Sequence, residues 1–178
     1  MNNCLEINGL TFRPYLSAAQ IAKRIGELAE ELKRDGADES TLFVCMLSGA
    51  FVFASDLLRA MNTTAEICFV KWSSYCGTQS SGELTEQLPV TADVKGRKVI
   101  VVEDIVETGM TMRRFVEKMK AMGAADCKIV SLLHKAQLQT HAVHIDWVGF
   151  EIDNAFVVGY GLDYDGKGRM LRDLYAKV

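Results

Sequence analysis

The chain has 178 residues, of which 49% are hydrophobic and 24% are charged, and its formal net charge is −3. This length and composition are typical of a soluble globular protein, and we expect residues 1–178 to form a single domain. The small acidic excess argues against general attraction to nucleic acid or to an anionic membrane surface. No apolar run approaches the roughly 18 residues expected of a membrane-spanning helix.

The first residues of the chain favour a cytoplasmic protein, because they contain neither a basic segment nor a long apolar segment that would mark a secretory signal. The five cysteines are odd in number and include no Cys-x-x-Cys pair. Cys45, Cys68 and Cys127 fall inside strand-like runs, and we interpret them as small buried hydrophobic residues.

The N-terminal third predicts a helix followed by a strand, a helix and a second strand. Ser17-Ala18-Ala19-Gln20 matches a capping box with Ser17 as the N-cap residue. Apolar residues then recur at helical spacing until Gly36 ends the helix; they are Ile21, Ile25, Leu28 and Leu32. Farther along, the pattern predicts a strand at 41–47, a tight turn at Ser48-Gly49-Ala50, a helix at 51–61 and a strand at 65–72.

Residues from about 73 to 97 differ in character, because they are small, polar and glycine-containing and lack helical periodicity. A loop of this length inside a compact domain is usually a lid or a disordered segment. We expect a flexible lid loop, part of which could pair as a hairpin.

The most informative segment begins at Val99. The four β-branched residues at 99–102 predict a buried parallel strand. Glu103 and Asp104 follow, where such a strand would end. These carboxylates can accept hydrogen bonds from ribose hydroxyls or hold Mg²⁺ through water.

A Thr-Gly-x-Thr loop, Thr108 to Thr111, follows the two acids and leads into a helix expected at about 111–122, which Gly123 ends. The backbone N–H groups at a helix start point outward, and the helix dipole favours an anion there. The segment therefore predicts a site for a sugar phosphate.

Strand-like runs at 127–133, 147–150 and 156–160 complete the chain. Strands and helices alternate through the middle, so we expect an α/β fold with a parallel sheet. Ligands bind at the carboxyl ends of the strands in such sheets. The strand ends that matter are Leu47-Ser48-Gly49, Trp72 to Tyr75, Glu103-Asp104 and Leu133-His134-Lys135.

The segment from Val101 to Thr111 resembles the phosphoribosyl pyrophosphate signature of type I phosphoribosyltransferases. The runs 148–152 and 156–164 resemble the hypoxanthine-guanine members of that family, and Leu47-x-Gly49 and Ser74-Tyr75-Cys76 occur in the matching order. The resemblance spans about residues 40–175. It implies a twisted, mainly parallel sheet flanked by helices, a small hood from the terminal segments and a flexible lid loop.

The activity that this resemblance implies is purine salvage, in which hypoxanthine or guanine reacts with phosphoribosyl pyrophosphate and Mg²⁺ to give IMP or GMP and pyrophosphate. The expected partners are these small molecules, with neither a membrane nor a nucleic acid among them. The family resemblance also suggests a homodimer or a homotetramer.

The site residues implied by the resemblance form several groups. Those that bind the ribose and its 5′-phosphate are Glu103, Asp104, Glu107, Thr108, Gly109, Met110 and Thr111. Those that bind pyrophosphate are Ser48, Gly49 and Arg169, and the metal ligands are Asp163, Glu103 and Asp104. The purine site comprises Lys135, which donates to O6, Phe156, which stacks on the ring, Val157, whose backbone reads the edge, and Asp163. Glu107 is the catalytic base, and Ser74 and Tyr75 lie on the lid.

The chain departs from the usual family pattern at three positions. Glu107 stands where the family usually has an aspartate as catalytic base, so the carboxylate is kept on an arm longer by one methylene. Met110 and Ser48 each stand where relatives often have a lysine. A regulatory nucleotide- or RNA-binding protein with little catalysis is therefore an alternative, although the acidic charge and the lack of a basic stripe oppose it.

Plainer interpretations of single residues remain open without the family pattern. Lys135 alone would be read as an ordinary surface lysine, and Phe156 alone as a core residue. His141 and His144 are three residues apart, but no acid or cysteine stands at a suitable spacing, so a zinc site is not expected.

Overall fold

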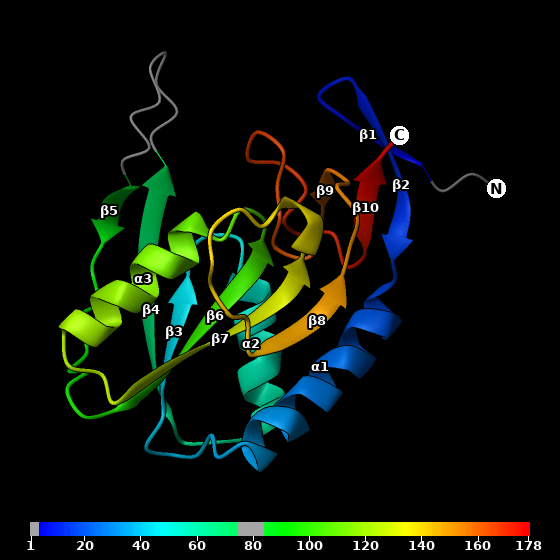
Figure 1. Cartoon of the computed structure of the whole chain (residues 1–178). Coiled ribbons are helices and arrows are strands. Elements are labelled where there is room, and N and C mark those ends of the chain that lie inside the picture. Colours follow the sequence, from blue (N-terminus) through cyan, green and yellow to red (C-terminus); the bar gives the residue numbers. More distant parts are fainter. Residues whose placement is uncertain (1–3, 75–83) are drawn as a thin grey trace.

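The computed structural model describes residues 4–74 and 84–178, which form a six-stranded sheet with helices on both faces and a smaller sheet beside it (Figure 1). The large sheet has the order β5-β4-β3-β6-β7-β8, and all neighbouring pairs are parallel except β4 and β5. Its strands are β3 (Leu42–Met46), β4 (Glu66–Ser74), β5 (Leu84–Leu88), β6 (Lys98–Val106), β7 (Asp126–His134) and β8 (Trp147–Glu151). The expected α/β fold with a mainly parallel sheet is confirmed.

Three helices cover the two faces of this sheet; they are α1 (Ala18–Arg34), α2 (Phe51–Met61) and α3 (Met110–Ala121). Phe43 and Cys45 of β3 pack in one core with α1 and α2, whereas Leu42 and Val44 pack in a second core with α3. Because both faces of the strands are buried, their sequences are unbroken apolar runs rather than alternating ones. In the described part of the chain, no helix combines the length and apolar character needed to cross a membrane.

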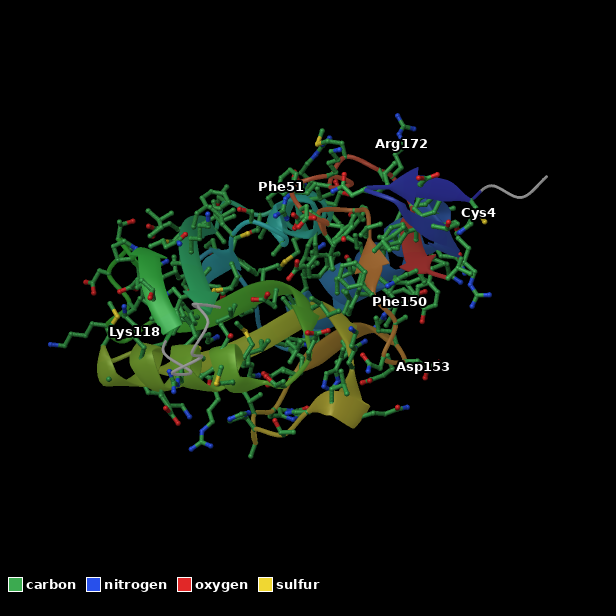
Figure 2. The ribbon with its side chains drawn as sticks, turned by 90° about the horizontal axis from the view of Figure 1, so that it is seen from above. Cys4, Phe51, Lys118, Phe150, Asp153 and Arg172 are labelled. Atoms are coloured by element: carbon green, nitrogen blue, oxygen red, sulfur yellow. The ribbon has the colours of Figure 1, made fainter. Side chains whose placement is uncertain are left out.

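The smaller sheet combines both ends of the chain and has the order β1-β2-β10-β9. Its strands are β1 (Leu5–Ile7), β2 (Leu10–Leu16), β9 (Val157–Val158) and β10 (Leu174–Lys177). It corresponds to the expected hood from the terminal segments. Figure 2 looks down on the carboxyl ends of the parallel strands, with Lys118 of α3 and Cys4 near β1 on opposite sides of the view.

Helix α1 begins and ends as its sequence predicts. The Ser17 backbone N–H donates to Gln20 Oε1 at 3.0 Å, and the Gln20 N–H donates to Ser17 Oγ at 3.3 Å, which completes the capping box. Gly36 follows the C-cap residue with φ +90°, a conformation that glycine adopts without steric cost.

Several boundaries differ from the prediction. Strand β6 continues through Val106, because its pairing with β7 extends to Ile105 and Val106. The helix after Gly109 starts at Met110 rather than Thr111, and the run at 156–160 forms a strand only at 157–158. Within the expected lid loop, β5 pairs antiparallel with β4, as the possible hairpin anticipated.

The three strand cysteines do not share one environment. Cys45 and Cys68 are buried, as expected, with exposed fractions of 0% and 5%. Cys127 is only partly buried, near the start of β7, so its interpretation as a fully buried residue is wrong. Cys76 lies outside the described residues.

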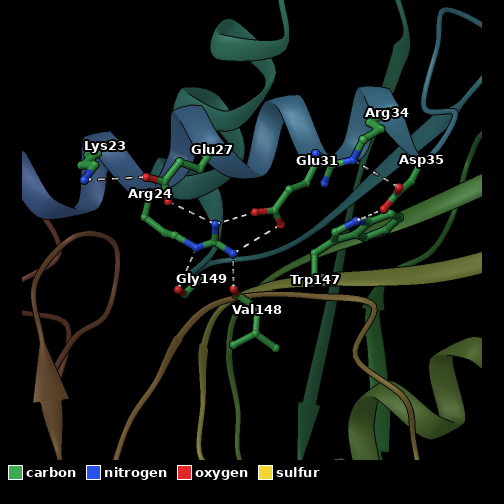
Figure 3. Close-up of polar contacts among 9 residues, drawn as sticks. All are labelled: Lys23, Arg24, Glu27, Glu31, Arg34, Asp35, Trp147, Val148 and Gly149. Atoms are coloured by element: carbon green, nitrogen blue, oxygen red, sulfur yellow. Dashed lines mark hydrogen bonds and ion pairs between the residues drawn. The ribbon is translucent and has the colours of Figure 1, made fainter.

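Arg24 of α1 forms hydrogen bonds with β8, the strand at one edge of the large sheet (Figure 3). Its Nε donates to the Gly149 carbonyl at 3.0 Å and its Nη2 to the Val148 carbonyl at 2.9 Å. Glu31 accepts from Nη1 at 2.7 Å, and this hydrogen bond is the main cause that raises the pKa of Arg24. Since β8 lies at the end of the sheet, the guanidinium ties this edge strand to α1 through two of its carbonyl groups.

The Arg24→Met variant is expected to lower the free energy of unfolding by about 1–3 kcal/mol, because two edge carbonyls and Glu31 lose their donor. Urea denaturation of the variant and the parent protein measures this difference. Arg34→Met is the matched control, since its side chain is 72% exposed and lies 4.0 Å from Asp35. Equal losses in the two variants would contradict a special role for Arg24.

Candidate functional site

The site lies where two neighbouring strands separate at the carboxyl edge of the large sheet. β3 pairs with β6 only as far as Cys45 and Val102, after which β3 enters the turn at residues 47–50. β6 runs on for four more residues, so Glu103 and Asp104 lie on a stretch whose β3 side is open. The acids therefore stand inside the strand rather than after its end.

Asp104 lies directly over the turn that follows β3. A Cβ atom on residue 49 would stand 1.6 Å from Asp104 Oδ2, so only glycine fits there. On the other side of the turn, a Cβ on Gly161 would stand 2.1 Å from the Gly49 carbonyl oxygen. Gly161 has φ +102° and its N–H donates to the Arg169 carbonyl at 3.0 Å. Two close backbone approaches thus bring the C-terminal loop onto the acidic strand end.

The two carboxyl groups influence each other strongly. Burial raises the pKa of Glu103 well above its ordinary value, and the negative charge of Asp104 raises it further. Burial also raises the pKa of Asp104, although hydrogen bonds from Glu103 and the Ile105 N–H oppose that rise. Glu103 is therefore the member of the pair that holds a proton more readily. Its Oε2 is buried without a hydrogen-bond partner among the described residues.

Residues 107–111 form the loop at the start of α3 that the sequence predicts to bind an anion, hereafter the anion-binding loop. Gly109 is the N-cap residue in the left-handed conformation, with φ +80°, and provides no side chain that could cap the helix. The Met110 N–H donates to Thr108 Oγ1 at 3.4 Å, and the N–H groups of the first helical turn are oriented toward the site where a ligand could accept from them. A pocket of about 310 Å³ opens at this loop and is also lined by Leu47, Trp72, Glu103 and Val106.

Lys135 and Glu107 meet beside this loop. Lys135 follows β7 directly, only 4% of it is exposed, and its backbone N–H donates to the Val106 carbonyl at 2.9 Å. Its Nζ donates to Glu107 Oε1. The Glu107 side chain is 48% exposed, so a buried ammonium group is paired with a carboxylate that faces solvent.

Asp163 and Arg169 form an ion pair in the C-terminal loop, with 2.6 Å between Asp163 Oδ1 and Arg169 Nη2. Asp163 Oδ2 also accepts from the Gly166 N–H at 2.7 Å, and Arg169 Nη1 donates to the Gly161 carbonyl at 2.7 Å. The charge of Arg169 lowers the pKa of Asp104, which links this pair to the acidic strand end.

Phe156 and Val157 belong to the smaller sheet. Phe156 is 44% exposed, and its ring packs against Phe12 and Tyr164 with centroid distances of 6.2 Å and 5.7 Å. The Lys177 N–H donates to the Phe156 carbonyl at 2.9 Å. In an antiparallel ladder this bond turns the Val157 N–H and carbonyl away from β10, toward the open edge of the sheet.

The predicted site residues thus form linked groups at one edge of the molecule. Ser48, Gly49, Asp104, Asp163 and Arg169 come together through the turn and the C-terminal loop, and Glu107 meets Lys135. Ser74 is the last residue of β4. Tyr75 lies outside the described residues, so the lid prediction remains a prediction.

Sequence reasoning assigned no role to three contributors to this site. Trp72, at one of the strand ends singled out from the sequence, lines the pocket while its ring packs on Phe115 with 5.2 Å between centroids. His134 and Gln139, which are hydrogen-bonded to each other at 2.9 Å, support the anion-binding loop from behind. A histidine at a strand end and a glutamine in a loop carry no spacing signal that would have identified them.

The acidic residues fit a divalent cation only in part. Within residues 4–74 and 84–178, no three His, Cys, Asp or Glu side chains are grouped closely enough to hold a metal ion by themselves. Mg²⁺ is usually held by one or two carboxylates together with substrate phosphates and water. The unpartnered Oε2 of Glu103 beside Asp104 fits this kind of site.

The raised pKa of Glu103 predicts a pH-dependent stability. The pKa of Glu103 is higher in the folded than in the unfolded state. Its protonated carboxyl group therefore contributes fully to the free energy of unfolding below about pH 4.5, and this contribution is lost as the pH rises through the raised pKa. The decline has a limit of about 1.4 kcal/mol per pH unit for one proton. Urea denaturation between pH 4.5 and 8 should show a smaller decline for Glu103→Gln than for the parent protein. Glu117→Gln, at an exposed position of α3, should follow the parent, and an unchanged decline in Glu103→Gln would refute the assignment.

Comparisons with known proteins agree with this geometry. The model of the phosphoribosyl transferase domain matches residues 14–165. The chain is 38% identical over 157 residues to a hypoxanthine-guanine phosphoribosyltransferase of Bacillus subtilis, covering 88% of this chain and 87% of the relative. It is also 38% identical over 152 residues to the hypoxanthine-guanine-xanthine phosphoribosyltransferase of Tritrichomonas foetus, covering 85% and 83%.

A solved structure of a hypoxanthine-guanine phosphoribosyltransferase from Bacillus anthracis is similar as well. It superimposes with a TM-score of 0.86 at 32% identity, over 93% of this chain and 97% of that one. The match of the domain model, the identity to these relatives and the shared fold lead to one conclusion. The chain belongs to the phosphoribosyltransferase family, among its hypoxanthine-guanine phosphoribosyltransferases.

Proposed function

We propose that the protein transfers the phosphoribosyl group of phosphoribosyl pyrophosphate to hypoxanthine or guanine, which gives IMP or GMP and pyrophosphate. One observation carries this proposal: an anion-binding helix start, an unpartnered carboxylate and a Lys135–Glu107 pair lie together at one sheet edge. A sugar phosphate needs the first two features, and a purine that presents both an acceptor and a donor fits the third.

The ribose and its 5′-phosphate occupy the β6–α3 segment in this proposal. Residues 107–111 hold the 5′-phosphate through backbone N–H groups and the hydroxyls of Thr108 and Thr111. Glu103 and Asp104 accept hydrogen bonds from the ribose hydroxyls. The unpartnered Oε2 of Glu103 supports this role, because a buried oxygen without a donor is stabilised by a ligand that supplies one.

The pyrophosphate lies over the turn after β3, between the backbone of Ser48 and Gly49 and the guanidinium of Arg169. Asp163, Glu103 and Asp104 would hold the Mg²⁺ that accompanies it. When bound, Mg²⁺ neutralises charge on the leaving pyrophosphate. Arg169 is already paired with Asp163, and this ion pair holds both side chains in position before a ligand binds.

The purine is recognised by three elements. Lys135, whose ammonium group is almost fully buried, donates to the exocyclic O6. Phe156 offers an exposed ring face for stacking, and the backbone of Val157 reads the edge of the base from the open side of β9. Ser74 and Tyr75 belong to a lid that excludes water during the reaction.

The chemistry breaks the bond between ribose C1 and the pyrophosphate oxygen and forms a bond between C1 and a purine nitrogen. The proton lost from the purine passes to Glu107, which stands beside the lysine that holds O6. Arg169 stabilises the negative charge of the departing pyrophosphate. Exclusion of water directs the ribosyl cation toward the purine rather than toward hydrolysis.

We also propose a cytoplasmic homodimer or homotetramer. Cys4, Cys45, Cys68 and Cys127 are free thiols, which agrees with a reducing compartment. Phe69 on β4 and Phe51 on α2 are large apolar side chains with exposed fractions of 43% and 37%, which agrees with contacts to further copies. The named relatives are transferases, so they favour the enzyme over the regulatory alternative.

A steady-state assay with phosphoribosyl pyrophosphate, Mg²⁺ and single bases tests the proposal. Hypoxanthine or guanine should be converted with a kcat/KM about 10³- to 10⁴-fold above that of adenine, because the amino group of adenine cannot accept from Lys135. Lys135→Met should remove most of this preference, whereas Lys120→Met, at an exposed position of α3, should keep it. The absence of nucleotide product with every 6-oxopurine would overturn the proposed function.

Glu107→Gln tests the assignment of the base. Removing the proton acceptor should lower kcat by about 10²- to 10⁴-fold while the affinity for phosphoribosyl pyrophosphate changes little. Rapid-quench turnover and calorimetric binding separate the two effects. If kcat is unchanged, the proton leaves by way of water or another group, and Glu107 is not the base.

A further inference from the structure

The peptide that joins Thr108 and Gly109 is held from outside the pocket by a separate segment, residues 139–143. The backbone N–H groups of Thr140 and His141 both donate to the Thr108 carbonyl, at 3.2 Å and 2.9 Å. The carbonyl and the N–H of a trans peptide point in opposite directions. Because the carbonyl is fixed on this segment, the Gly109 N–H points away from it, toward the pocket that residues 108–111 line.

The same segment packs against Gly109 itself. A Cβ atom at residue 109 would lie 2.9 Å from the His141 carbonyl oxygen and 2.9 Å from Val143 Cγ1. Gly109 is buried and has φ +80°, so its conformation depends on what lies over it. Any movement of the segment would therefore change both the space around Gly109 and the direction of its N–H.

Gln139 holds this segment in its shape. Its Nε2 donates to the His141 carbonyl at 3.2 Å and to the Val143 carbonyl at 2.6 Å, so both amide protons are used inside the segment. The amide oxygen consequently faces His134 Nε2, at 2.9 Å. The orientation of the amide group follows from these three contacts together.

His134 connects Gln139 to the rigid sheet. It is the last residue of β7, and only 7% of it is exposed. Its Nδ1 lies 2.9 Å from Glu151 Oε1 at the end of β8, and its carbonyl accepts from the Ile152 N–H at 2.9 Å. A continuous chain of contacts thus runs from the ends of β7 and β8 through Gln139 to the Thr108 carbonyl.

We propose that Gln139, oriented by His134, is a positioning residue that aims the Gly109 N–H at the bound phosphate. Gln139 itself lies behind the loop and acts only through segment 139–143. It sets the affinity for the phosphate group, not the recognition of the purine. The inference rests on the proposed function only in taking the bound anion to be the 5′-phosphate of a ribose.

The test replaces Gln139 with methionine, which is similar in length but makes none of the three hydrogen bonds. Calorimetry with ribose 5-phosphate should show a Kd raised about tenfold, as expected when hydrogen bonds that orient a donor are lost. Gln137→Met is the matched control, because Gln137 is an exposed residue of the short 3₁₀ turn Ala136–Leu138, which directly precedes Gln139. This control should bind like the parent protein.

Steady-state kinetics distinguish positioning from general destabilisation. The KM for phosphoribosyl pyrophosphate should rise about tenfold in Gln139→Met, while kcat and the KM for guanine stay within about twofold of the parent values. Gln139→Glu, which keeps the acceptor toward His134 but loses both donors, should give the same selective loss and serves if the methionine variant does not fold. Unchanged binding of ribose 5-phosphate in a folded variant, or an equal rise in both KM values, would overturn the inference.

The two proposals can fail separately. Ribose 5-phosphate binding requires no turnover, so a loss of affinity in Gln139→Met supports the positioning role even if no purine is converted. Conversely, purine conversion with parent-like phosphate binding in both Gln139 variants would leave the proposed function intact and refute the role of Gln139.

Discussion

The arrangement of the site depends on two adjacent, partly buried carboxyl groups on a strand that has lost one neighbour. Glu103 and Asp104 lie beyond the last residue pair between β3 and β6, so no hydrogen-bonded strand covers them on that side. Burial raises the pKa of both groups, and the charge of Asp104 raises that of Glu103 further, whereas the hydrogen bond from Glu103 opposes the rise in the pKa of Asp104. A cation or several hydroxyl donors relieve this cost. The proposed ligand, a polyhydroxylated sugar with an accompanying cation, would supply both.

The surrounding backbone approaches these acids as closely as glycine permits. The Asp104 side chain lies in close contact with Gly49, and Gly161 of the C-terminal loop packs against the Gly49 carbonyl. This stacking brings Arg169 near enough for its charge to lower the pKa of Asp104, although the two residues are far apart in sequence. The smaller sheet, built from both ends of the chain, holds the C-terminal loop in place through β9 and β10. The terminal segments thus complete the site rather than merely cover it.

Much of the fold and part of the site could be predicted from the sequence, and the exceptions have physical reasons. The capping box and the apolar runs act locally, so α1 and the buried parallel strands followed directly. Strand β2 was missed because it contains Pro14, which lacks a backbone donor. The strand tolerates it since β1 pairs only with residues 10–12, leaving Pro14 without a partner on that side. The contacts of Glu107 and Gln139 were missed because they join strand ends and loops whose proximity only the folded chain reveals.

The pairing of Glu107 with Lys135 changes how the departure from the family pattern is understood. A glutamate at this position raises the question of whether its longer arm displaces the carboxylate from its task. In the fold, the Glu107 carboxylate contacts the buried ammonium group of Lys135, directly after β7. In the proposed reaction, Glu107 takes the proton of the purine and Lys135 donates to O6, and their contact means that the two groups are neighbours before the purine binds. A 6-oxopurine presents an acceptor and a donor side by side, so under the proposed function the Glu107–Lys135 pair offers a partner to each.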